Sequence, residues 1–269
     1  MHSVAALGAA ATVISTAFAL CTLDRWLARR KLHELAWSQS LAMFAVASGA
    51  YWWAAATGWS ALSFRVFYLF GAILNVPYLA VGTVALLRGE AVGRRVLSGL
   101  HVVAAFCAGA VLIAPLHRPV APDGLPSGKE IFGIGPRIMA AVGSGVGATV
   151  VLVGAVASVY RLLRSRRAVA DTIAGSSSGS SSGSGVSPGR LAATNSMIAL
   201  GTLLLGVGGA GFTGADAMVA FGVFLAVGVA LLFVGFLLSS PSTAPPARRP
   251  HHLSPFLDEL WDLAHSEPR

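Results

Sequence analysis

Charged residues are scarce in this chain. Only 11% of its 269 residues are Asp, Glu, Lys or Arg, whereas a soluble domain carries about 25%. So few charges do not cover a surface that faces water. Hydrophobic residues make up 55% of the chain, and its mean hydropathy is +0.72. Lipid must therefore replace water around most of the surface, which predicts an all-α integral membrane protein.

The residues that enzymes and pumps need are also missing. The middle of the apolar runs holds no Asp, Glu or Lys, so there is no carboxylate relay for protons and no lysine in the last run to hold retinal. We find no phosphate loop, no dinucleotide fingerprint and no catalytic Ser–His pair. His251 and His252 stand alone, and the two cysteines lie inside apolar runs, which argues against a disulfide framework. The sequence thus predicts no catalytic residues, no cofactor and no metal.

Long apolar runs are what the chain has in abundance. A membrane-spanning helix needs about 20 apolar residues, and seven runs meet that length. Lipid offers no partner for backbone N–H and C=O groups, so each run is predicted to be a helix. The predicted spans are residues 4–23, 35–57, 63–87, 96–116, 138–159, 191–212 and 218–238.

The basic residues orient this predicted bundle. Fifteen of the nineteen Lys and Arg residues fall in alternate connections and in the C-terminal tail. The positive-inside rule then places the N-terminus outside and the C-terminus in the cytoplasm. The excess of basic over acidic residues is explained by this topology, so no nucleic-acid partner is implied. The expected location is the cytoplasmic (inner) membrane, with the lipid bilayer as the first partner.

The first run has two possible interpretations. Ala17–Ala19 resembles a signal-peptidase site, but a signal peptide carries positive charge before its apolar core. Here the basic cluster follows the run instead, which favours a retained helix. Aromatic residues mark the expected membrane interfaces: Trp26 and Trp37 on the inner side, and Tyr51, Trp52, Trp53 and Trp59 on the outer side.

The third run holds residues that are costly in lipid. At helical spacing Arg65, Tyr68 and Asn75 share one face, and Pro77 predicts a kink. His101 lies about one turn into the fourth run. Such residues mark functional sites by default, so the four polar residues form a candidate intramembrane site with Arg65 as an anion-attracting gate. The alternative is that they only join helices by hydrogen bonds.

Small residues predict where helices approach closely. The fifth run has one stripe of small residues, made of Gly143, Gly147, Gly154 and Ser158. The seventh run has a similar surface of small residues, made of Gly222, Gly228 and Gly235. Small residues let helix backbones come together in membranes. These stripes are therefore interpreted as packing surfaces.

Two connections stand out by composition. Residues 117–136, rich in Pro and Gly, form the longest outer connection. It is either a plain connector or the one outside segment large enough to meet a ligand. Residues 173–189 form a Gly/Ser tract that resembles a synthetic linker and is expected to be a flexible cytoplasmic coil.

The tail, residues 241–269, begins as a Pro-rich spacer and ends in a predicted short acidic amphipathic helix capped by Ser254. Its apolar stripe consists of Phe256, Leu257, Leu260 and Trp261. An acidic polar face is repelled by anionic lipid, because membrane-lying helices carry basic faces. The stripe is therefore a candidate docking helix for a cytoplasmic protein partner or for the basic loops of the chain itself.

Two segments, RRKLHELAWSQSLAMFAVASGAYWWA from residue 29 and FRVFYLFGAILNVPYLAVGTVALL from residue 64, carry a family resemblance. They resemble a group of uncharacterised multi-pass membrane proteins of actinobacteria. The resemblance implies a bacterial inner membrane and carries no activity.

Two functions remain open on this evidence. The first is a non-enzymatic signalling or scaffolding membrane protein that acts through its cytoplasmic tail. The second is a transporter of a small, possibly anionic solute, with its site in the third span. An enzyme that acts on lipid ranks below both.

Overall fold

A computed structural model describes residues 2–174, 197, 200–201, 204–205 and 217–239. These residues form helices joined by short connections, with no strand among them. The helices are α1 (His2–Arg29), α2 (Leu32–Thr57), α3 (Ala61–Phe67), the π-helix η1 (Tyr68–Leu74), α4 (Asn75–Arg88), α5 (Glu90–Ile113), α6 (Gly128–Ile131), α7 (Ile134–Ala174) and α9 (Ala217–Ser239). The all-α prediction is confirmed for this part of the chain.

Three predicted features lie wholly or mostly outside the described residues. They are the span 191–212, the Gly/Ser tract 173–189, and the tail with its docking residues Phe256, Leu257, Leu260 and Trp261.

Five of the described helical segments are long and apolar enough to cross a membrane. They are Ser3–Arg29, Ala61–Arg88, Glu90–Ile113, Ile134–Gly154 and Ala217–Leu238. Large apolar side chains on their outer faces remain exposed, such as Ile113 (85%) and Val102 (72%). This is the surface of a multi-pass membrane protein.

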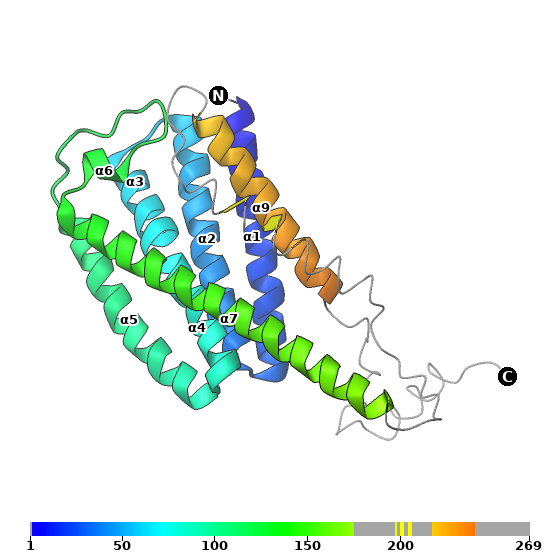
Figure 1. Ribbon diagram of the computed structural model, residues 1–269. Coiled ribbons are helices and arrows are strands. Elements are labelled where there is room, and N and C mark those ends of the chain that lie inside the picture. The colour runs from blue at the N-terminus through cyan, green and yellow to red at the C-terminus, as the bar shows by residue number, and fades with distance from the viewer. Residues whose placement is uncertain (1, 175–196, 198–199, 202–203, 206–216, 240–269) are drawn as a thin grey trace, which may run out of the picture.

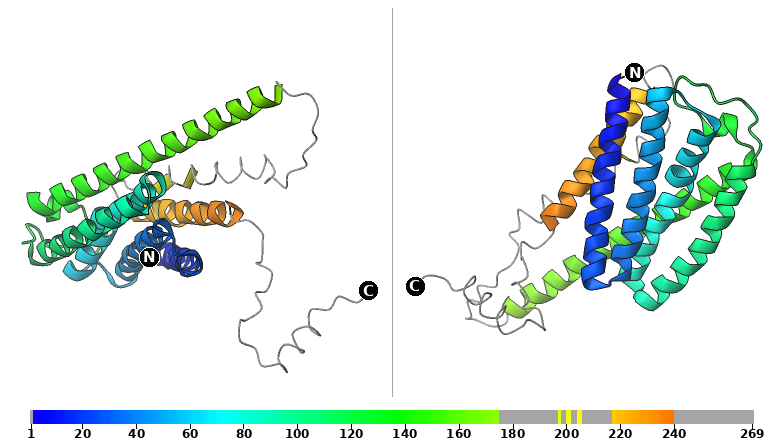
Figure 2. Two further views of the ribbon diagram at one scale, coloured as in Figure 1. Left: turned by 90° about the horizontal axis from the view of Figure 1, so that it is seen from below. Right: turned by 180° about the vertical axis from the view of Figure 1, so that it is seen from behind.

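Helix α2, which corresponds to the predicted span 35–57, is not among these five. It is long enough, but it carries Glu34, Ser38, Ser40 and Ser48, all of them buried. It contacts α1 along one side and α4 along another (Figures 1 and 2). A helix that faces other helices tolerates polar residues, so hydropathy alone is a poor guide to α2.

The bundle has α1 and α7 on opposite sides (Figure 2). Helices α1 and α2 run side by side, α9 packs on α1, and α7 crosses the bundle diagonally against α4 (Figure 1). We call the end that holds the N-terminus the cap end and the opposite end the far end. The C-terminal part of α7 projects to one side of the bundle, past α1 and α9, and ends near the level of the far end (Figure 1).

The predicted connection between the first two spans is almost entirely helical, because only Arg30 and Lys31 lie outside α1 and α2. Two arginines of α1 clamp the buried Glu34 of α2: its Oε1 lies 3.6 Å from Arg25 Nε and 3.7 Å from Arg29 Nη1. Opposite charges buried together reduce the cost of taking each from water. The basic cluster therefore also fixes the α1–α2 turn.

The glycine stripe of α7 is a packing surface, as predicted, and its partner is the end of η1 and the start of α4. A Cβ atom placed at Gly143 would lie 2.7 Å from the carbonyl oxygen of Ile73, and one at Gly147 would lie 3.0 Å from the nitrogen of Pro77. The two backbones are thus in direct contact. Only glycine permits this approach, because any side chain would meet backbone atoms that cannot turn away.

Substituting Gly143→Ala is therefore expected to push α7 off the kink. Overpacking costs about 1–3 kcal/mol, so the thermal unfolding midpoint in detergent should fall. Gly145→Ala is the matched control, since a Cβ at Gly145 meets nothing within 4 Å and alanine is the better helix former. Equal midpoints for the two variants would contradict the close contact.

Candidate functional site

The third span changes helix type in its middle. It begins as α3, passes through the π-helix η1 and continues as α4. The N–H of Asn75 donates to the carbonyl of Phe70, five residues earlier rather than four. π-Helical turns are rare and occur frequently at functional sites. The predicted kink at Pro77 thus takes the form of a wide helical turn directly before it.

The wide turn solves a hydrogen-bond problem that Pro77 creates. Continued by two residues, the π-helical pattern would direct the N–H of residue 77 to the carbonyl of Ala72, but proline has no N–H. The hydroxyl of Ser144 on α7 donates to that carbonyl instead, at 2.5 Å. A side chain of one span therefore completes the backbone of another.

Asn75 joins the same span to α2. Its Oδ1 accepts a hydrogen bond from Ser40 Oγ at 2.6 Å, and the same hydroxyl lies 2.9 Å from the Asn75 carbonyl. Ser40 is buried. The amide of Asn75 thus links two helices, in agreement with the interpretation of polar residues as interhelical hydrogen-bonding groups.

Arg65 satisfies the end of α5. Its guanidinium donates to the carbonyl of Val111 and, at 2.8 Å, to the carbonyl of Ala114. The last four carbonyls of a helix have no partner within the helix, and in lipid no water replaces it. The guanidinium also lies 5.9 Å from the ring centroid of Phe132. The positive charge thus faces carbonyl dipoles and an aromatic face.

The connection between α5 and α7 folds onto the bundle. We call residues 114–133 the cap. Its two ends pair through an antiparallel bridge between Leu116 and Phe132, and the N–H of His117 donates to the carbonyl of Ile131 at 2.9 Å. The middle of the cap is also attached to the bundle, because the N–H of Trp59 donates to the carbonyl of Pro122 at 3.1 Å. The cap is an ordered part of the structure.

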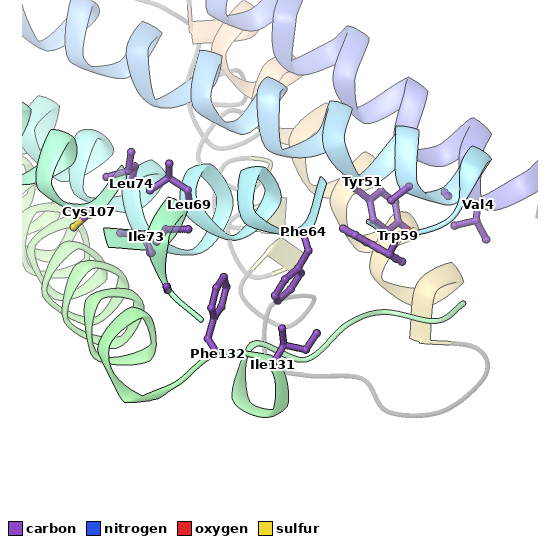
Figure 3. Close-up of a cluster of buried hydrophobic side chains, with 14 residues drawn as sticks. Val4, Tyr51, Trp59, Phe64, Leu69, Ile73, Leu74, Cys107, Ile131 and Phe132 are labelled. Atoms are coloured by element: carbon purple, nitrogen blue, oxygen red, sulfur yellow. The ribbon is translucent and has the colours of Figure 1, made fainter. Parts of the chain in front are cut away.

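Aromatic rings hold the cap on the third span. Phe132 is buried and stacks on Phe64, with centroids 5.2 Å apart, and lies 4.9 Å from the ring of Tyr68. Figure 3 shows Phe132 and Phe64 pointing toward each other, with Ile131 beside them. Nearby, Tyr51 and Trp59 are buried in the same core cluster. Of the four residues predicted at the outer interface, Tyr51 and Trp59 are thus buried, whereas Trp52 and Trp53 are exposed.

The structure brings only two of the four predicted site residues together. Arg65 and Tyr68 both contact Phe132, while Asn75 faces Ser40 of α2. His101 is exposed on α5, where its Nδ1 lies 2.8 Å from the Leu97 carbonyl and its ring packs edge-on against Tyr78. The extra residue in the π-helical turn rotates Asn75 away from the Arg65 face, which ideal α-helical spacing did not anticipate.

The sequence analysis missed Ser40, Phe132 and Ser144. Two of them carried a signal: Ser144 lies beside a predicted packing glycine, and Ser40 lies in a polar patch inside a predicted span. Phe132 lies in a segment with the composition of a loop, and no signal in the sequence pointed to it. Among the described residues, no group of three or more His, Cys, Asp or Glu side chains is placed to hold a metal.

Comparison with known proteins gives no relative: no protein-family model, curated protein or solved structure matches this chain.

Replacing Arg65 by leucine should destabilise the cap end. It leaves the Val111 and Ala114 carbonyls without their donor, and a hydrogen bond to a charged group is worth about 1.5–3 kcal/mol. Thermal unfolding in detergent measures the loss. Arg137→Leu is the control, because Arg137 makes no hydrogen bond or ion pair to any described residue. An unchanged midpoint for Arg65→Leu would show that the guanidinium does not cap α5.

A double-mutant cycle tests the role of Ser144. Ser144→Ala should cost about 0.6–2 kcal/mol in the wild-type background, the range measured for interhelical hydrogen bonds in membranes. In a Pro77→Ala background the same substitution should cost almost nothing, because residue 77 then supplies an N–H. Unfolding free energies of the four proteins give the coupling. An identical cost in both backgrounds would refute the compensation.

Proposed function

We propose that this is a non-enzymatic signalling protein of the cytoplasmic membrane, in which α7 links the cap outside the cell to segments in the cytoplasm. The observation that carries the proposal is the continuity of α7 from the cap, across the bundle, to a C-terminal part that projects from the side of the bundle near the far end (Figure 1).

The length of α7 exceeds what a membrane requires. Its 41 residues correspond to about 60 Å of helix, twice the hydrocarbon thickness of about 30 Å. The part Ile134–Gly154 is by itself long and apolar enough to span. The last turns, which carry several arginines in the sequence, project from the side of the bundle near the far end (Figure 1). A span that served only as an anchor would need no such extension.

Two sets of contacts position the first part of α7 on the bundle. Phe132, which fixes the cap to Arg65 and Tyr68, lies two residues before the first residue of α7. Farther along, Gly143 and Ser144 rest on the kinked backbone at Ile73 and Ala72. A displacement of the cap thus acts on α7 directly, and the kink is the point about which α7 can tilt.

The topology we propose remains the predicted one of seven spans, with α2 as the second span and the N-terminus outside. The positive-inside rule supports it, because the far end then faces the cytoplasm. The cytoplasmic extension of α7 and the acidic tail, with Phe256 and Trp261 on its stripe, would together present the signal to a protein partner.

Spin-label distance measurements test the relay. In a background of Cys21→Ser and Cys107→Ala, labels at Leu27 of α1 and Ser165 of α7 report on the far end. Removing the cap contact with Phe132→Ala should shift the distance between the labels by several ångströms. A tilt of a few degrees at the cap is enlarged along the length of α7.

The control for this measurement is Ile113→Ala, which shortens a side chain of the cap end that is 85% exposed and should leave the distance unchanged. Circular dichroism establishes that each variant keeps its helix content. If Phe132→Ala changes nothing at the far end, or Ile113→Ala changes as much, the relay is wrong.

One observation favours the second function, transport of a small solute. The π-helix and the Ser40–Asn75 pair place polar atoms in the middle of a span, and such turns frequently occur at functional sites. The geometry supports this function less, because Arg65 and Asn75 bind protein groups on different sides of the span. Solute uptake that is lost on Asn75→Leu would favour it.

A further inference from the structure

A hollow of about 400 Å³ opens at the cap end of the bundle. It lies where η1, α6 and the first turns of α7 meet, and Figure 1 shows α6 and the start of α7 beside α3. The residues that line it are Tyr68, Lys129, Ile134, Arg137, Ile138 and Ala141. It thus combines two cations, a tyrosine and an apolar wall.

The two cations are not neutralised by the described part of the protein. Lys129 comes from α6 and Arg137 from α7, and neither makes an ion pair there. The acid next to Lys129 in sequence, Glu130, is directed instead to Arg118, at 3.8 Å. Two positive groups from different helices therefore face one hollow, and an anion is the ligand that complements them.

The apolar wall continues out of the hollow into the membrane. Ile134 is 74% exposed and Ile138 is 54% exposed, and below them on α7 follow Val142 at 57% and Val146 at 61%. Their spacing of four residues puts them on one stripe along the helix. The stripe runs from the charged hollow toward the middle of the span, within Ile134–Gly154.

We infer that this hollow binds the headgroup of an anionic phospholipid from the leaflet at the cap end. The phosphate lies between Lys129 and Arg137, and an acyl chain follows the Ile138–Val146 stripe. A free phosphate ion would use only the cations and would leave the stripe unexplained. The inference does not depend on the proposed signalling function.

A second cationic hollow, of about 600 Å³, lies at the far end and is lined by Ala91, Arg94, Arg95 and Ser98. All four residues belong to one helix, α5, so two elements do not converge on it. The cap-end hollow is the better built of the two, because Lys129 and Arg137 reach it from different helices beside the ring of Tyr68.

Native mass spectrometry of the detergent-solubilised full chain, titrated with phosphatidylglycerol or phosphatidylcholine, tests the inference. The wild type should retain one tightly bound phosphatidylglycerol that Arg137→Gln and Lys129→Gln each weaken by about tenfold, as expected for loss of a charged hydrogen bond. Arg88→Gln is the matched control: it removes one exposed cation that lines neither hollow, and binding should be unchanged.

Three results would overturn the inference. The first is equal weakening by Arg88→Gln, which would mean attraction to net charge alone. The second is unaltered phosphatidylglycerol binding in both Arg137→Gln and Lys129→Gln. The third is displacement of the bound lipid by millimolar inorganic phosphate, which would identify a site for the free ion. Thermal unfolding curves verify that the variants are folded, and Ile138→Gln, which keeps both cations, should weaken the lipid as well.

Discussion

The absence of hydrogen-bond partners in lipid is the constraint on which this structure depends. Every backbone group in a span must be satisfied by the protein itself. Pro77 removes one donor from the third span, and the end of α5 leaves carbonyls without partners. Ser144 supplies the first missing donor and Arg65 supplies the second. The residues that appear costly in the sequence are those that meet this requirement.

The need to satisfy these backbone groups also fixes how the helices are arranged. A serine hydroxyl reaches a carbonyl of another helix only if the two backbones are very close, and Gly143 and Gly147 permit that distance. Likewise, the guanidinium of Arg65 that reaches α5 lies against Phe132 of the cap. Hydrogen bonding and packing are therefore coupled, and the kink, the glycine stripe and the cap form one continuous structure.

The sequence predicts helices, and the glycine stripe of the fifth span, because composition and spacing are local properties. It does not predict what depends on other helices. The π-helical turn changes which residues share a face, so Asn75 separates from Arg65. Tyr51 and Trp59 are residue types that are typical of the membrane interface. The sequence does not predict that other aromatic rings bury them. The cap has the composition of a loop, and only tertiary contact makes it ordered.

A charge inside a membrane protein is a functional candidate by default, and Arg65 shows why the default requires a structure. Carbonyl oxygens complement the positive charge of Arg65. In the same way, Arg25 and Arg29 complement the negative charge of Glu34. A group whose charge is already complemented by its own chain gains little from a ligand. Charges that no described residue complements, as at Lys129 and Arg137, do gain from one. Function is thus better sought among the unpaired cations at the membrane surface than among the buried polar residues that the sequence marks first.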